Sequence, residues 1–182
     1  MLFRSLLPAD LAKKTRRELD ELGVRVIKIG TVFEKMSYDK DVIVVKAGRP
    51  VEFLLENTDL MPHNFAITQP GALEEIGLLS EASAQKPGFA EKHYVPDSPK
   101  ILLKSTLLQP RESQKLSFVA PKELGVYPYV CTYPGHWRRM YGALYVVEDL
   151  DDYQANPESY LAEHKIEAKD PLLKDQIGRA HV

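Results

Sequence analysis

The feature that most constrains the fold is a series of eight short segments, rich in β-branched and aromatic residues, between positions 24 and 148. Glycine, proline, asparagine and aspartate separate these segments, and such residues favour turns. Helical patterns do not alternate with the segments, which argues against a parallel α/β fold. We therefore predict an all-β antiparallel sandwich. The predicted strands are VRVIKIG, DVIVVKAG, RPVEFLLEN, HNFAIT, ILLKSTLL, QKLSFVA, GVYPYVC and GALYVVE.

The alternation of apolar and polar residues supports these assignments to different degrees. In RPVEFLLEN, Val51, Phe53 and Leu55 alternate against Glu52 and Glu56, as expected for a strand with one buried face. The alternation in VRVIKIG is imperfect. Pro128 interrupts GVYPYVC and cannot donate a ladder hydrogen bond, so we expect this position to face a sheet edge or a bulge.

Helical patterns are confined to the two ends and to one long insertion. Residues 8–22 have apolar positions at helical spacing. The insertion between the strands that begin near 63 and 101 contains GALEEIGLLSEASAQ, which predicts a helix within a flap over the sandwich. Near the C-terminus, NPESYLAEHKI predicts a short surface helix with Asn156 as N-cap and Pro157 in its first turn.

These patterns divide the chain into three parts. We expect an N-terminal helix or linker over 1–22, a main domain over 23–149, and a helical tail or linker over 150–182. LFRS at 2–5 and QIGRAHV at 176–182 resemble translated read-through of a sequencing-library adapter. We expect these terminal residues to be artefactual, and they are excluded from the fold prediction.

Composition excludes several classes of function. A formal net charge of −2 without a dense basic patch argues against nucleic-acid binding. The longest apolar runs fall far short of the ~20 residues that span a bilayer, so we expect no membrane insertion of this segment. The single cysteine excludes an internal disulfide.

Residues 131–140, CTYPGHWRRM, carry the features that point to chemistry. They place the thiol of Cys131, the imidazole of His136 and the thioether of Met140 within ten residues, around a Pro-Gly turn. The segment joins the ends of two predicted strands, so all three side chains can converge at one pole of the sandwich. Soft sulfur ligands and imidazole suit copper, and a Cys plus two His with a weak axial Met is the electron-transfer copper arrangement.

That arrangement requires a second histidine from elsewhere in the chain. His63, in NTDLMPHNFAIT, lies where a loop enters a strand and is the best candidate. Asn64 follows it directly, and its amide could tie the two ligand loops together and hydrogen-bond near the cysteine sulfur. His93 lies in the insertion, and we expect it to be an exposed loop residue and not a metal ligand.

The two loops together resemble a known family. CTYPGHWRRM, with NTDLMPHN upstream, resembles the copper loop and first-histidine loop of the azurin and auracyanin branch of the cupredoxins, or blue copper proteins. The likeness runs from about Val24 to Glu148, and Gly125 and Tyr127 match the family pattern before the cysteine. It implies a cupredoxin-like Greek-key β-sandwich with one type 1 copper ion. The metal ligands implied by the resemblance are His63, Cys131, His136 and Met140.

The resemblance also implies how the protein works. Electron transfer would be its role, without enzymatic catalysis, and His136 would be the electron port with its outer edge close to solvent. The carbonyl of Pro62 lies where azurins place a weak extra axial oxygen. The implied location is periplasmic or otherwise extracytoplasmic.

Two departures from azurins bear on the partner. The azurin disulfide is impossible here, and Trp137, Arg138 and Arg139 follow His136 where azurins have an apolar docking face. An aromatic and cationic face favours an acidic or haem-bearing redox partner, such as a c-type cytochrome or haem domain. The flanking helices resemble those of cupredoxin domains embedded in larger bacterial oxidoreductases that also carry c-type haem.

Three alternatives remain at this point. A thiol enzyme could use Cys131 with His136 as base, but this leaves Met140 and His63 without a role. A closed zinc site could use two histidines and the cysteine, although thioether is a poor zinc ligand. A copper chaperone or storage module would use the same ligands without an electron-transfer role, and the sequence separates this poorly from a carrier.

Overall fold

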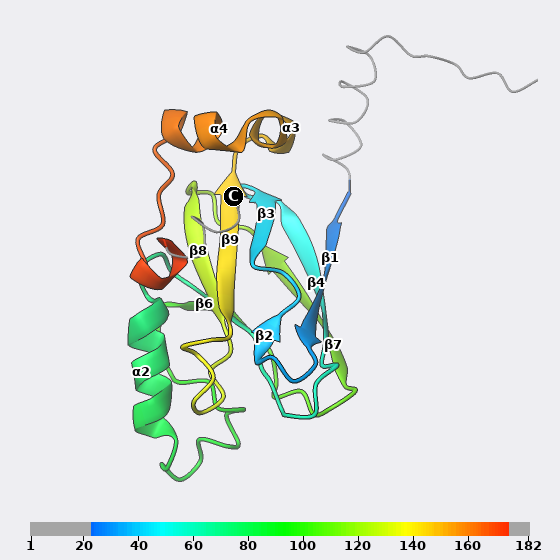
Figure 1. The fold of residues 1–182 in the computed structure, drawn as a ribbon, viewed down its shortest axis with the longest axis vertical. Helices are drawn as coiled ribbons and strands as arrows, with labels where there is room; N and C mark the ends of the chain where they lie inside the picture. Colours follow the sequence, from blue (N-terminus) through cyan, green and yellow to red (C-terminus); the bar gives the residue numbers. More distant parts are fainter. Residues whose placement is uncertain (1–22, 175–182) are drawn as a thin grey trace, which may run out of the picture.

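A computed structural model of the chain describes residues 23–174, which form two β-sheets packed face to face (Figure 1). The first sheet has the strand order β2-β1-β4-β7 and the second the order β3-β9-β8-β5-β6. The strands of the first sheet are β1 (Arg25–Val32), β2 (Ser37–Tyr38), β4 (Pro50–Glu56) and β7 (Ser113–Val119). Those of the second are β3 (Val42–Lys46), β5 (Ala66–Thr68), β6 (Ile101–Lys104), β8 (Gly125–Val130) and β9 (Tyr141–Val147). The predicted all-β sandwich is confirmed.

The sheets are mixed, which corrects the expectation of purely antiparallel pairing. β1 pairs with β4 in parallel, and β3 pairs with β9 in parallel, whereas the other neighbours are antiparallel. The reason lies in the chain path. β3 belongs to the opposite sheet, so the chain crosses over after β1 and returns to the first sheet in the same direction in β4.

Each of the eight predicted segments contains a strand, and one strand was missed. β2 has two residues, Ser37 and Tyr38, which is too short for a periodic pattern. Pro128 lies in β8, which is a central strand and not an edge. It is in register with Ala143 of β9, and the pairing of β8 with β5 stops at Tyr129. The missing N–H of the proline therefore falls beyond the end of the β5 ladder.

The main core fills the space between the two sheets. Inward positions of β4 are buried, and Phe53 in that strand is fully enclosed. Phe65 contacts Phe53 and Tyr129 at ring-centroid distances of 5.6 and 5.4 Å. Tyr38 completes the cluster at 5.7 Å from Phe65. Aromatic burial of this kind contributes both apolar area and ring contacts, and it makes the scaffold stiff.

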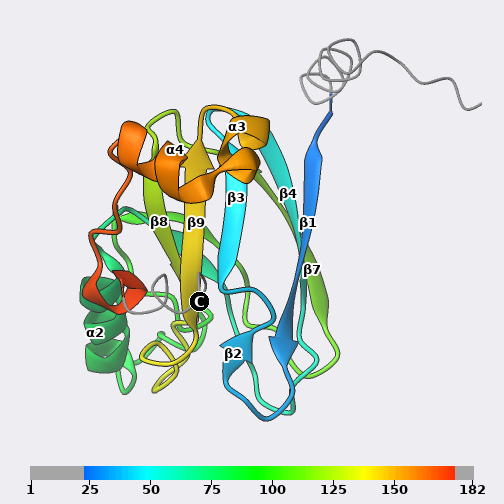
Figure 2. The same cartoon turned by 45° about the horizontal axis from the view of Figure 1, so that its top comes forward.

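A second core lies on the outer face of the five-stranded sheet, where the helices pack (Figure 2). The helices are α2 (Leu73–Ser83), α3 (Leu150–Ala155) and α4 (Pro157–Glu163). α2, in the insertion, was predicted, and so was α4 with its Asn156 cap, whose side chain accepts from the amide of Ser159. α3 was not predicted. The predicted helix over 8–22 lies outside the described residues.

Up to Lys174, the C-terminal segment packs against the rest of the domain, which corrects the expectation of a surface-lying tail. Tyr160 and Leu173 are buried in the second core, together with Tyr145 and Val147 of β9. The carboxylate of Asp170 accepts from the amides of Gly71 and Leu73 at 2.8 and 2.9 Å, at the start of α2. The tail therefore holds the insertion helix in place. The boundary at 149/150 stays a prediction.

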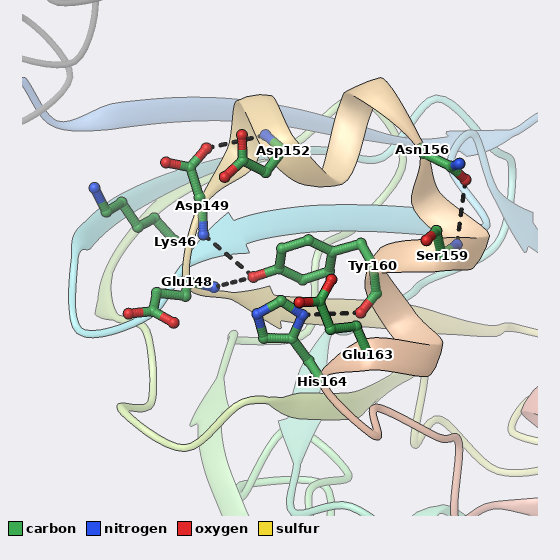
Figure 3. Close-up of a pocket in the computed structure, with 9 residues that line it drawn as sticks. All are labelled: Lys46, Glu148, Asp149, Asp152, Asn156, Ser159, Tyr160, Glu163 and His164. Atoms are coloured by element: carbon green, nitrogen blue, oxygen red, sulfur yellow. Dashed lines mark hydrogen bonds between the residues drawn. The ribbon is translucent and has the colours of Figure 1, made fainter.

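A pocket lies at the carboxyl end of β9, where α3 and α4 begin (Figure 3). It is mostly polar, and Tyr160 closes its floor by accepting hydrogen bonds from the amides of Glu148 and Asp149. This is the end of β9 opposite to the loop that carries Cys131 and Met140. Among the helices within 23–174, none is long and apolar enough to cross a membrane.

Candidate metal centre

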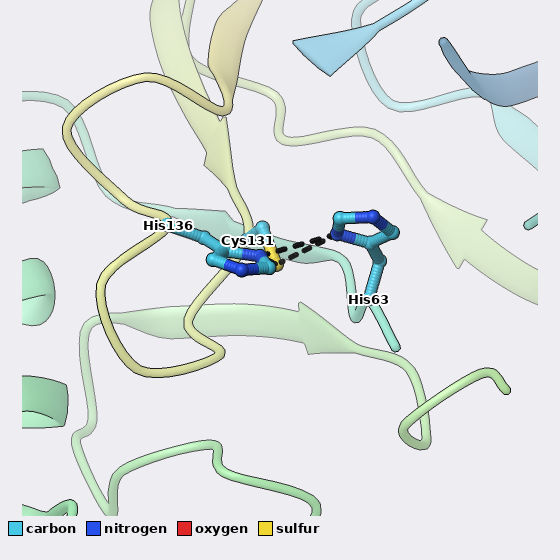
Figure 4. A group of neighbouring side chains, drawn as sticks. All are labelled: His63, Cys131 and His136. Carbon is cyan, nitrogen blue, oxygen red and sulfur yellow. Dashed lines mark hydrogen bonds between the residues drawn. The ribbon is translucent and has the colours of Figure 1, made fainter. Parts of the chain in front are cut away.

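Three side chains from two distant parts of the chain meet at one end of the sandwich (Figure 4). His63 precedes β5 and forms an isolated bridge with Leu108, while Cys131 directly follows β8 and His136 lies in the loop before β9. The Nδ1 atoms of His63 and His136 are 3.2 Å apart. The Sγ atom of Cys131 lies 3.9 Å from the first Nδ1 and 3.6 Å from the second. Three of the four predicted ligands are therefore brought together.

The loop from Cys131 to Met140 is folded by its own backbone. The amide of His136 donates to the carbonyl of Tyr133 at 3.0 Å, and the amide of Met140 donates to the carbonyl of His136 at 2.9 Å. Gly135 has a φ of 86°, a left-handed conformation that glycine adopts without strain. These turns direct the His136 ring back toward the cysteine that begins the loop.

Asn64 ties the two ligand loops together, as predicted. Its Oδ1 accepts from the amide of Thr132 at 2.7 Å, and its Nδ2 donates to the Thr132 hydroxyl at 3.0 Å. The same Nδ2 also donates to the carbonyl of His93 at 2.8 Å. Asn64 therefore fixes Thr132, which follows Cys131, relative to the loop that carries His63. Its bond to the carbonyl of His93 also secures the insertion.

The donor set fits a small transition-metal ion. The three separations define a triangle whose centre lies about 2.1 Å from each donor atom, within the ~2.0–2.3 Å of metal bonds to imidazole nitrogen and thiolate sulfur. All three side chains are buried, at 2% exposure or less. Three lone-pair atoms aimed at one enclosed point are what a metal requires and what a purely structural core avoids.

In the metal-free protein, burial determines the protonation states of Cys131 and His136. Burial raises the pKa of the Cys131 thiol to about 12, although hydrogen bonds from the amides of Asn64 and Tyr133 act in the opposite direction. Burial, followed by the neighbouring His63, lowers the pKa of His136 to about 4, although Asp59 acts the other way. The His136 lone pair is therefore available at neutral pH, whereas the thiol loses its proton only to a metal.

Met140, the fourth predicted ligand, is fully buried in the same core cluster as Cys131. Its carbonyl accepts from the amide of Cys131 at 2.9 Å, so the two residues lie opposite each other where β8 ends and β9 begins. Its thioether as an axial ligand stays a prediction, and so does the carbonyl of Pro62, which belongs to a half-buried residue.

A carboxylate partner of His63 was missed by the sequence prediction. Asp59 lies four residues before the histidine, and its Oδ2 is 2.9 Å from His63 Nε2. Both side chains are buried. Burial alone would raise the pKa of Asp59, but hydrogen bonds from the Glu34 amide, His63 and the Leu60 amide outweigh it and lower the pKa. The Asp-x-x-x-His spacing was a usable signal in the sequence.

His136 is covered, which corrects the expectation that its outer edge is close to solvent. Only 2% of the residue is exposed. The Tyr133 ring lies over it at a centroid distance of 4.9 Å, and Tyr94 of the insertion packs against Tyr133 at 5.0 Å. The flap predicted from the insertion therefore covers the metal pole, and it does so on the His136 side.

The aromatic part of the predicted face is also corrected, whereas Arg138 and Arg139 are exposed as expected of its cationic part. Trp137 is 3% exposed and packs against Gly77 of α2, where a side chain would leave no room for the indole. The guanidinium of Arg138 lies 4.3 Å from the Trp137 ring centroid and forms an ion pair with Glu81. These residues hold α2 against the metal loop and do not present an indole to a partner.

Comparisons with known proteins agree with this geometry. A family model described as copper binding proteins, plastocyanin/azurin family, matches residues 26–147. Auracyanin-A of Chloroflexus aurantiacus is 31% identical over 126 residues, which make up 68% of this chain and 75% of that protein. The solved structure of auracyanin A, a "blue" copper protein from that bacterium, gives a TM-score of 0.61 at 32% identity, covering 69% of this chain and 100% of the other. Reduced auracyanin from Roseiflexus castenholzii gives 0.60 at 27% identity, covering 69% and 99%.

The fold and the donor set define a cupredoxin, and the chain belongs to the plastocyanin/azurin family of copper-binding proteins. Within that family it is similar to the auracyanins. It is a blue copper protein with one copper ion, and its function is electron transfer at a type 1 copper site rather than catalysis.

Proposed function

We propose that His63, Cys131, His136 and Met140 are the copper ligands through which this chain transfers electrons. The observation that carries the proposal is the buried triangle of two Nδ1 atoms and one Sγ, with separations of 3.2, 3.6 and 3.9 Å. Copper bound to such ligands supplies a one-electron couple. Met140 lies opposite Cys131 in the fold and is the thioether candidate for the weak axial position.

The contribution of the chain is to hold the ligands still. The backbone of His63 is fixed by its bridge to Leu108, and the amide of Cys131 is fixed by its hydrogen bond to the carbonyl of Met140. Neither ligand loop therefore depends on the metal for its backbone position. Asn64 locks the two loops to each other. A donor set that is built in advance changes little between oxidation states, which favours fast electron transfer.

The same observations disfavour the alternatives. A nucleophilic thiol is exposed and has a lowered pKa, whereas Cys131 is fully buried and its pKa is raised to about 12. A closed zinc site takes a fourth N, S or O ligand and leaves the buried Met140 without a role. A chaperone or storage module releases its metal, and an enclosed, cross-braced site is poorly suited to release.

We further propose that the chain is a module of a larger bacterial oxidoreductase in the periplasm or another extracytoplasmic compartment, with a c-type cytochrome or haem domain as redox partner. The flanking segments support this, because the helices α3 and α4 extend beyond the region that matches the family model. Size-resolved detection of the native protein with an antibody, in fractionated cells, tests both parts. A free carrier of this length in the cytoplasm would contradict them.

The ligand set is tested by the absorption spectrum of the copper-loaded protein. We expect the intense visible thiolate-to-copper band in the wild type and its loss in Cys131→Ser. His63→Ala and His136→Ala should each weaken or abolish the band, and Met140→Leu should preserve it while raising the reduction potential. The matched controls are His93→Ala and His164→Ala, which alter histidines outside the triangle. A colourless wild type after cupric loading would overturn the proposal.

Reversible electrochemistry separates a carrier from a store. A carrier gives a stable one-electron wave over many cycles and keeps its copper in both states. A storage module loses copper on reduction in the presence of a Cu(I) chelator. Metal retention after repeated reduction is therefore the deciding measurement.

A further inference from the structure

We propose that Asp59 is a positioning residue of the copper site: its carboxylate fixes the tautomer of His63 and lowers the reduction potential of the metal. The inference rests on the proposed ligand set. It concerns the hydrogen bond between Asp59 Oδ2 and His63 Nε2, which is 2.9 Å long and lies on the side of the imidazole away from Cys131 and His136.

The carboxylate is held rigidly from several directions. Its Oδ1 accepts from the amide of Leu60 at 2.8 Å and from the amide of Glu34 at 3.0 Å. The main-chain amide of Asp59 donates to the Thr31 hydroxyl at 3.1 Å and to Asn57 Oδ1 at 3.0 Å. Two loops, one after β1 and one after β4, therefore converge on this side chain.

This network determines which nitrogen of His63 carries the proton. Both carboxylate oxygens act as acceptors, so the imidazole must donate Nε2–H to Asp59. The lone pair is then left on Nδ1, the atom that faces Cys131 Sγ at 3.9 Å. A carboxylate behind a ligating histidine orients the ring and raises its basicity. Asp59 therefore prepares His63 as a ligand before the metal arrives.

The network also places a negative charge close to the metal position. Asp59 is 5% exposed, so its charge is only weakly screened. A nearby carboxylate stabilises Cu(II) more than Cu(I), because the oxidised ion carries the larger positive charge. The result is a lower reduction potential than the same ligands would give with a neutral hydrogen-bond acceptor behind the histidine.

Two substitutions test the role in opposite ways. In Asp59→Asn, the amides of Leu60 and Glu34 require an oxygen, which turns the new NH₂ group toward His63 Nε2. Donor then faces donor, and the imidazole escapes by moving its proton to Nδ1, where it blocks the metal. In Asp59→Ala, water can accept Nε2–H, so the tautomer survives. We therefore expect the isosteric Asn variant to bind copper more weakly than the Ala variant.

The measurements are Cu(II) affinity by competition, the visible band, and the reduction potential at fixed pH. We expect Asp59→Asn to lose about 10–100-fold in affinity. Both variants should have a raised potential, and a tenfold change in the Cu(II)-to-Cu(I) affinity ratio corresponds to about 59 mV. The control is Glu34→Gln, which removes one negative charge from an exposed side chain in the neighbouring loop after β1 and should change none of these quantities.

The outcomes separate this inference from the ligand assignment. If the wild type shows no blue band, the ligand assignment has failed. A blue wild type whose Asp59 variants both retain its potential overturns the role of Asp59. So does the reverse order of affinities, with Ala weaker than Asn, because that order is expected if the carboxylate only packs the loop. Far-UV circular dichroism confirms that each variant is folded.

Discussion

The two histidines of the copper site lie in contrasting surroundings. Behind His63 there is the buried Asp59, whose carboxylate accepts two further hydrogen bonds and whose main-chain amide donates two more, and the exposed apolar side chains of Leu60 and Met61 lie in the same loop. Behind His136 there are aromatic rings of the metal loop and the insertion. One side of the site is polar and tightly fixed, and the other is apolar and covered.

The difference indicates a division of labour between the two loops. The His63 loop controls ligand geometry and charge, because Asp59 acts on the imidazole through a short hydrogen bond. The insertion controls access, since Tyr94 and Tyr133 lie between His136 and the surroundings. Asn64 connects the two halves, because it bonds both Thr132 and His93.

The largest effect is expected from breaking that connection. Asn64→Ala removes three hydrogen bonds and leaves the buried amide of Thr132 without its acceptor, so the free energy of unfolding should fall by about 3 kcal/mol. Urea unfolding of the metal-free protein measures the loss. Asn156→Ala, which removes an exposed helix cap, should cost only about 1 kcal/mol and leave the copper spectrum unchanged. Equal losses in the two variants would contradict the bridging role.

The two sides should also separate by pH in the metal-free protein. The folded-state pKa of His136 is lowered to about 4 from an ordinary value of 6.5, so the unfolded chain binds its proton first as pH falls. Stability is therefore full above pH 6.5 and is lost between there and about pH 4, by up to about 3 kcal/mol. The pKa of Asp59 is lowered from 3.8, so its contribution to stability is complete above that pH and is lost as the pH falls further.

The measurement is the free energy of unfolding of the metal-free protein at a series of pH values. His136→Gln should remove most of the slope between pH 6.5 and 4 and leave the decline below pH 3.8 in place. An unchanged slope in that variant would show that another group carries it. Copper loading should extend the same decline to lower pH in the wild type, because bound metal keeps the proton off Nδ1 in the folded protein while the unfolded chain still takes it up.

A smaller effect is expected from loosening the support of the covered side. Gly77→Ala places a methyl group where the Trp137 ring lies, so α2 and the metal loop must move apart. Overpacking of this kind costs about 2 kcal/mol. The control is Glu74→Ala, on the exposed side of the same helix, which should be nearly neutral. If Gly77→Ala is as stable as the control, the insertion is not anchored through Trp137.

Much of the fold could be predicted because strand periodicity is a local property. Every run that alternates like Val51, Phe53 and Leu55 became a strand, and the ten residues from Cys131 to Met140 predicted the metal loop. The parallel pairing of β1 with β4 could not be predicted in this way, because it depends on which sheet receives β3.

The misses at the site have a common physical cause. Trp137 and His136 were expected near the surface because the resemblance to azurins places an electron port and a docking face there, but burial is decided by what packs on top. The covering residue Tyr94 is 42 positions before His136 and lies in a segment without a strong pattern. Asp59 was overlooked for a different reason, since a lone aspartate in a loop is most often solvated, and only its spacing from His63 distinguishes it.

The smallest expected effect concerns access to the covered histidine. Tyr133→Ala should uncover the His136 ring, because the tyrosine lies over it at 4.9 Å, and bring small reagents closer to the metal. Oxidation of the reduced protein by a small inorganic cobalt(III) complex should then be a few-fold faster, whereas Tyr133→Phe, which keeps the ring, should match the wild type.

Leu60→Ser makes the corresponding change on the other side. Leu60 is already 65% exposed and covers no ligand, so the rate with the same complex should not change. Acceleration in both Tyr133→Ala and Leu60→Ser would mean that small reagents approach from either side and that the tyrosine cover does not govern access. Acceleration in Tyr133→Ala alone would locate the barrier on the His136 side, where the insertion distinguishes the surroundings of one histidine from those of the other.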